Sequence, residues 1–94
     1  MNYICLICGF NKLREAPFDK YSCGSYEICH CCGCEFGYDI MHLDNEKLVK
    51  LRESWINNGM IFKTKEKIPL DWNANEQIKN LNKIDILNND YEVK

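Results

Sequence analysis

The sequence predicts a small α+β domain stapled by a metal ion, with an N-terminal ribbon of two cysteine turns and short β-strands followed by two helices. Three observations lead to this fold class. All seven cysteines lie between Cys5 and Cys34, two pairs of them have the spacing Cys-x-x-Cys-Gly, and two helix patterns follow. A chain of 94 residues buries a modest core, for which a bound metal is a common supplement.

The ribbon is expected from the two cysteine turns and the segments that lead into them. The first turn is Cys5–Gly9, which follows the short β-prone segment Asn2–Ile4. The second is Cys29–Gly33, which an extended segment over Tyr21–Ile28 precedes. Residues 9–20 are expected to form the loop between them.

Each turn suits a metal because it places two thiols on one side, and the glycine after the second thiol takes a backbone angle that a β-carbon would oppose. Zinc prefers four such ligands in a tetrahedron. We call each of these cysteine turns a knuckle. Twenty residues separate Cys8 in the first knuckle from Cys29 in the second, which is within the usual span of a zinc ribbon. The sequence therefore predicts one Zn²⁺ per chain, with iron as the alternative ion, bound by Cys5, Cys8, Cys29 and Cys32.

A second register is open, because Cys31–Cys34 is also a Cys-x-x-Cys segment. The positions of the glycines favour Cys29 and Cys32 as the ligands of the second turn. Gly33 follows Cys32 just as Gly9 follows Cys8, whereas Cys34 is followed by a glutamate.

The other candidate ligands have no assigned role, and whether Cys31, Cys34, Cys23 or His30 takes part stays open. Cys31 is expected to point away from the ion, Cys34 to be a small, at least half-buried residue, and Cys23 to be a spare thiol. His30 and His42 are expected on the surface. No base-and-acid pair accompanies these residues, so the sequence does not indicate an enzyme.

The first helix is expected over about Asn45–Asn58. Asp44 is a suitable N-cap, and Gly59 occupies the position where helices commonly end. Its apolar residues recur at helical spacing and form one stripe: Leu48, Leu51, Trp55 and Ile56.

A second helix is expected from Asn73 to about Leu81. Asn73 with Glu76 three residues later resembles a capping box. Residues 82–94 fit a strand, a helical extension or a docked tail.

The chain is expected to form a single domain over residues 1–94, with a zinc-ribbon lobe at 1–42 and a helical part at 43–94 packed on it. The formal net charge of −2 falls in the lobe, which argues against a nucleic-acid partner. No signal peptide precedes the cysteines, and no apolar stretch approaches the roughly 20 residues that span a bilayer. We therefore expect a cytoplasmic protein without a membrane partner, whose thiols stay reduced.

Several segments together resemble the small bacterial cysteine-rich CPCC proteins: residues 3–10, 25–39, 52–59 and 70–77. The name-giving motif of that family falls on Cys29–Cys32, and the likeness covers about residues 3–80. It implies a rubredoxin-like or zinc-ribbon site. Leu6 and His30 stand where the family usually has proline, and Cys34 where an aromatic residue is common. The prolines stiffen the turns and are not ligands, so these departures leave the metal site intact.

The sequence thus favours a zinc-binding small protein with a structural four-cysteine site that acts as a protein-interaction module, such as an inhibitor, immunity protein or adaptor. The alternatives are a rubredoxin-like iron electron-transfer protein and a nucleic-acid-binding zinc ribbon. Any function near the site is expected to use the helical face or the knuckle tips, which are Leu6, Ile7, His30 and Cys31.

Overall fold

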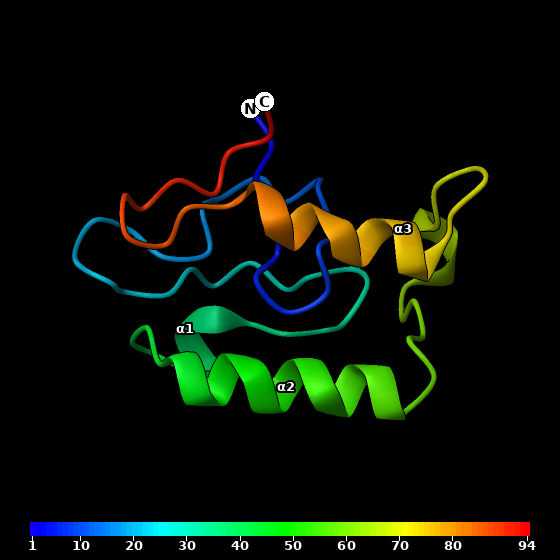
Figure 1. Ribbon diagram of the computed structural model, residues 1–94, viewed down its shortest axis with the longest axis horizontal. Helices are drawn as coiled ribbons and strands as arrows, with labels where there is room; N and C mark the ends of the chain where they lie inside the picture. Colours follow the sequence, from blue (N-terminus) through cyan, green and yellow to red (C-terminus); the bar gives the residue numbers. More distant parts are fainter.

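The computed structural model, which describes residues 1–94, places the first cysteine turn between two helical layers (Figure 1). One layer is the helix α2 (Asn45–Asn57), and the other is α3 (Ala74–Ile78) with the 3-10 segment η2 (Lys79–Lys83). A short helix, α1 (Phe36–Asp39), precedes α2, and a 3-10 turn, η1 (Lys65–Lys67), lies in the loop after it. None of these helices has the length and apolar character needed to cross a lipid bilayer.

The expected β-strands are reduced to isolated bridges. Tyr3 pairs with Leu13 and with Glu92, and Ile28 pairs with Glu35. Each of these segments bends into a knuckle or loop after a single pair, so no ladder extends. The fold is therefore a small domain with a cysteine cluster and three helices, in which a ribbon is not clearly developed.

The helix α2 confirms the sequence analysis at both ends. The side chain of Asp44 accepts hydrogen bonds from the backbone N–H groups of Glu46 (3.0 Å) and Lys47 (3.3 Å). The helix ends at Asn57, one residue before the expected end, and Gly59 follows in the left-handed region with φ +99°. The polar N-cap and the glycine thus fix the length of this helix.

The second predicted helix is present but shorter. The side chain of Asn73 accepts from the N–H of Glu76 at 3.0 Å, as a cap should. The reciprocal half of the capping box is missing, because the Glu76 carboxylate pairs with Lys79 at 3.1 Å. After Ile78 the chain tightens into η2 and leaves the α-helical form before Leu81.

Two further segments differ from or extend the sequence analysis. The helix α1 was not predicted, and the Asp39 carboxylate stabilises its first turn by accepting from the N–H of Glu35 at 2.8 Å. The C-terminal segment is a docked tail. Ile4 N–H donates to Tyr91 O at 2.7 Å, and the Tyr91 side chain is buried. The two chain ends consequently meet at one edge (Figure 1).

The core surrounds the cysteines and joins both halves of the chain. Trp55 of α2 is buried as predicted, whereas Ile56 at the edge of the same stripe is 41% exposed. Phe62 packs edge-on against Phe10 at 5.6 Å and against Trp72 at 5.4 Å between ring centroids. These aromatic contacts tie the loop after α2 and the start of α3 to the first cysteine turn.

Candidate metal centre

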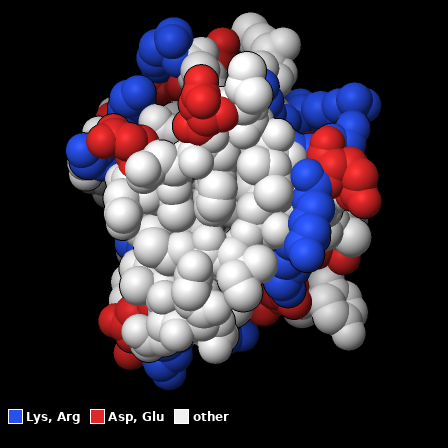
Figure 2. All heavy atoms as spheres, turned by 90° about the vertical axis from the view of Figure 1, so that its right-hand side faces the viewer, with Lys and Arg blue, Asp and Glu red and all other residues white.

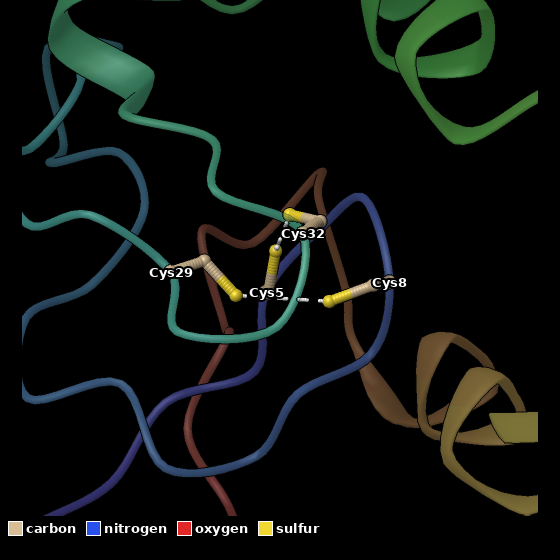
Figure 3. Close-up of side chains that lie close together, drawn as sticks. All are labelled: Cys5, Cys8, Cys29 and Cys32. Atoms are coloured by element: carbon tan, nitrogen blue, oxygen red, sulfur yellow. Dashed lines mark hydrogen bonds between the residues drawn. The ribbon is translucent and has the colours of Figure 1, made fainter. Parts of the chain in front are cut away.

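The four sulfurs predicted as ligands come together in the structure. The Sγ atoms of Cys5, Cys8, Cys29 and Cys32 all lie within 4.8 Å of one another (Figure 3). Cys5 Sγ is 3.7 Å from Cys32 Sγ, and Cys8 Sγ is 3.7 Å from Cys29 Sγ. Sulfurs at the corners of a zinc tetrahedron are separated by about 3.8 Å, as metal–sulfur bonds of about 2.3 Å require. The cluster could therefore hold a metal ion.

The two knuckles have the same backbone arrangement, which agrees with the register chosen from the glycines. Gly9 N–H donates to Cys5 O at 3.0 Å, and Gly33 N–H donates to Cys29 O at 2.9 Å. Within the first knuckle, Ile7 N–H points at Cys5 Sγ at 3.4 Å. Cys31 and Cys34, the alternative pair, lie outside the group of four sulfurs.

Both knuckle glycines are favoured by their backbone angle, and Gly9 is also required by a close backbone neighbour. Gly9 has φ +83° and Gly33 has φ +79°. A Cβ at Gly9 would lie 2.3 Å from the carbonyl oxygen of Gln77, and one at Gly33 would lie 2.7 Å from Cδ of Lys63. The Gln77 backbone therefore approaches the first knuckle too closely for a larger residue, whereas the flexible Lys63 side chain could move away from the second.

Helix α2 supplies hydrogen-bond donors to the tip of the first knuckle. The Arg52 guanidinium donates through Nη2 to Leu6 O at 2.8 Å and through Nε to Ile7 O at 3.3 Å. Leu6 and Ile7 are 0% and 1% exposed. The expectation that these two tips are displayed to solvent is thus wrong, because α2 covers them.

The rest of the first knuckle is bound by α3 and η2. Gln77 Nε2 donates to Cys8 O at 3.0 Å, and Asn80 Nδ2 donates to Gly9 O at 2.9 Å. Gln77 is the one polar side chain in the buried set, and its Oε1 accepts from Trp72 Nε1 at 2.7 Å. A glutamine in this position therefore connects a core tryptophan with the knuckle backbone.

The second knuckle is bound by the loop after α2. Lys63 N–H donates to Cys31 O, and Thr64 N–H donates to His30 O, both at 2.9 Å. Cys31 is fully buried, and its Sγ accepts from Gln77 Nε2 at 3.3 Å. Of the two tip residues of this knuckle, Cys31 is therefore covered and His30 is partly exposed.

The sulfurs of Cys34 and Cys23 take the structural roles expected of them, whereas Cys31, expected to point away from the ion, is hydrogen-bonded to Cys8. Cys34 is buried, and burial raises the pKa of its thiol well above the usual range. Cys23 is exposed and lies on a backbone bridge to His42, away from the four-sulfur group. His42 is also exposed.

Protonation of the cluster is uneven without a metal. Burial raises the pKa of Cys5 and of Cys8 well above the ordinary thiol value. Hydrogen bonds from Cys32, Cys5 and Cys8 lower the pKa of Cys29. A metal that binds here must therefore displace the thiol protons of Cys5 and Cys8.

Sequence reasoning located the four sulfurs but missed Arg52 and Gln77. These two residues lie more than forty positions from the backbone groups that they bind. A lone arginine on α2 and a lone glutamine on α3 form no local pattern, so their roles emerge only from the folded chain.

The fold and the sulfur geometry define a class of small protein, a cysteine-cluster domain with a candidate metal-binding site. Within that class, the chain belongs to the family of the uncharacterized protein YoaQ of Bacillus subtilis (strain 168). The two are 35% identical over 96 residues, which cover 85% of this chain and 74% of the relative.

A second relative from the same organism, the uncharacterized protein YozI, is 29% identical over 113 residues, which cover 98% of this chain and 93% of YozI. No family model matches the chain, and no solved structure matches it. The resemblance to CPCC proteins thus stays a prediction, while a bacterial origin fits both relatives.

The close packing at Gly9 gives a first prediction. We expect Gly9→Ala to lower the free energy of unfolding by clearly more than Gly59→Ala, measured by urea denaturation. Both positions have positive φ, for which a β-carbon costs about 1–2 kcal/mol. At Gly59 the new Cβ would meet only Ile61 Cγ1 at 3.8 Å, whereas at Gly9 it would meet the Gln77 backbone. Equal losses in the two variants would contradict the close approach at Gly9.

The Arg52 contacts give a second prediction. Arg52→Met keeps much of the aliphatic length but removes both donors, so we expect unfolding free energy to fall by about 2 kcal/mol. Lys50→Met is the matched control on the exposed side of the same helix and should change stability by less than about 0.5 kcal/mol. A similar loss in both variants would show that the guanidinium does not stabilise the knuckle.

Proposed function

We propose that the four clustered cysteines bind one Zn²⁺ as a structural ion, and that the domain held by this ion acts as a protein-interaction module. The observation that carries the proposal is the convergence of four sulfurs at tetrahedral spacing. Four sulfur ligands fill the coordination shell of zinc and leave no position for a reacting water. This supports a binding role rather than catalysis.

The packing around the cluster further supports a structural ion. Three of the four cysteines, Cys5, Cys8 and Cys29, are at most 1% exposed, and the chain covers the tip of the first knuckle. Both knuckles, α2, the loop after it and α3 with η2 meet at this point. An ion bound there would stabilise the folded state directly, because an unfolded chain does not offer the four thiols together.

Metal content tests the first half of the proposal. Protein purified aerobically should be colourless and contain about one zinc per chain by elemental analysis. Cys5→Ser and Cys32→Ser should lose most of the metal and lower the free energy of unfolding. Cys23→Ser, which changes an exposed cysteine outside the cluster, should retain both metal and stability.

Two results would contradict this half of the proposal, one on the identity of the metal and one on the ligands. A red protein with visible absorption and bound iron would replace zinc by the rubredoxin-like alternative. Full metal content in Cys32→Ser would show that the ligand set is wrong.

The interaction role is supported by exposed apolar residues at the end of α2 and in the loop after it. Four of them form what we call the apolar end face: Ile56 (41% exposed), Ile61 (58%), Ile68 (42%) and Leu70 (94%). Figure 2 shows the side of the molecule that carries these segments, where a broad uncharged area is bordered by acidic and basic groups. Exposed apolar area with a polar margin is typical of protein-binding surfaces.

A capture experiment with paired variants tests the interaction role. Tagged protein should retain a partner from an extract of the native host, and Leu70→Glu should abolish retention of that partner. The matched control is Leu87→Glu, because Leu87 is 97% exposed in the turn between Asp85 and Asp90. That segment lies at the opposite end of the molecule (Figure 1). A partner retained equally by both variants would exclude the apolar end face, and no specific retention by the wild type would count against the role itself.

A further inference from the structure

The cysteine cluster is not covered equally on all sides, because a cavity opens beside one of its sulfurs. This cavity has a volume of about 370 Å³ and lies between the second knuckle and α2. Leu51, Trp55 and Ile61 provide apolar walls, Lys63 lies at its side, and Cys32 forms part of its lining. The size is within the range of pockets that bind small molecules.

Cys32 differs from the other three cysteines in its exposure. Cys5, Cys8 and Cys29 are at most 1% exposed, whereas Cys32 is partly exposed and is the one member of the cluster that lines the cavity. In Figure 3 the Cys32 side chain lies on the side of the cluster toward the helices α1 and α2. A molecule in the cavity would therefore meet this sulfur before any of the others.

We propose that the cavity admits a small thiol bearing a carboxylate, which exchanges with Cys32 as a ligand of the bound metal. The inference rests on the metal site of the proposed function and adds a route by which the ion enters and leaves. In the exchange, the metal–sulfur bond to Cys32 breaks and one to the entering sulfur forms. The proton that the entering thiol loses passes to Cys32 Sγ, so no oxidant or reductant is needed.

A thiol is the chemical class that suits this position. A thiolate-bound zinc or iron ion favours soft sulfur donors over oxygen ligands, so an entering sulfur can replace a leaving one at similar free energy. Cys5, Cys8 and Cys29 would remain in place during the exchange, since surrounding chain holds them buried. The chain would then hold the ion by three sulfurs while the entering thiol occupies the fourth position, and a chelator could remove the ion more easily from this state.

Lys63 favours a thiol with a negative charge. Its side chain runs across Gly33, the residue after Cys32, and a Cβ built on that glycine would lie 2.9 Å from Nζ, so the ammonium group lies at the same cavity as Cys32. Lys63 takes part in neither of the two ion pairs of the structure, and its charge is available to a ligand. Asp39 also lines the cavity and keeps its negative charge, but its carboxylate is held toward the Glu35 backbone N–H, and Lys63 is the one basic residue of the lining.

Zinc release measured with a colorimetric chelator tests the charge preference. The protein is loaded with zinc in a Cys23→Ser background, which removes the exposed competing thiol. Zinc release should be faster with N-acetylcysteine than with 2-mercaptoethanol, which carries no carboxylate. In Lys63→Gln the ratio of the two rates should fall by about two- to fivefold, as expected for the loss of an exposed ion pair. An unchanged ratio would overturn the role of Lys63.

Filling the cavity tests the route itself. Ser54 lines the cavity from α2, and Ser54→Trp should slow release by both thiols, while Glu53→Trp, which alters an exposed neighbour outside the cavity, should not. Iodoacetamide followed by peptide mass spectrometry should modify Cys32 first among the four cysteines of the cluster.

The outcomes separate this inference from the proposal on which it rests. Modification of Cys5, Cys8 or Cys29 as fast as Cys32, or equal release rates in the two tryptophan variants, would overturn the exchange route alone. A purified protein that binds no metal would overturn the metal site as well.

Discussion

The peptide groups of the two knuckles impose the constraint on which this structure depends. When a knuckle turns its N–H groups inward, as at Ile7, its carbonyl oxygens face away from the sulfurs. Those oxygens are buried in this protein, and a buried carbonyl without a donor destabilises the fold. Donors arrive from distant parts of the chain, through Arg52 of α2, Gln77 of α3 and the backbone at Lys63. The helical part therefore completes the cysteine lobe as well as packing on it.

This arrangement couples the cluster to the helices in both directions. Four thiols gathered by a metal would fix the two knuckles, and the fixed carbonyls would in turn hold α2, α3 and the intervening loop. If the knuckles unfold, the helices lose their hydrogen-bond acceptors, and if the helices unfold, the knuckle carbonyls lose their donors. This mutual dependence favours cooperative unfolding of the whole chain over separate unfolding of one lobe. The hydrogen bond between Trp72 and Gln77 extends the same coupling into the aromatic core.

Local patterns explain what the sequence could predict. Glycine after the second thiol identified the sulfurs that meet, Asp44 and Asn73 marked two helix starts, and Gly59 marked a helix end. The sequence could not show that the tip of the first knuckle is covered, because the covering residues lie far along the chain. The helix α1 was also missed, since its four residues contain a glycine and depend on the Asp39 side chain. Strands were overestimated because an extended segment has the same sequence pattern whether it forms a single bridge or a ladder of several pairs.

The docked tail has a consequence for how the protein is made. Ile4, next to the first knuckle, is hydrogen-bonded to Tyr91, far along the chain. On the ribosome, the cysteine turns emerge well before the donors for their carbonyls and the tail beside them. The nascent chain therefore carries its thiols without their final cover until Tyr91 has left the exit tunnel. The domain can complete its fold only after that point, and the thiols are most exposed to capture by wrong metals or oxidants during the interval before it.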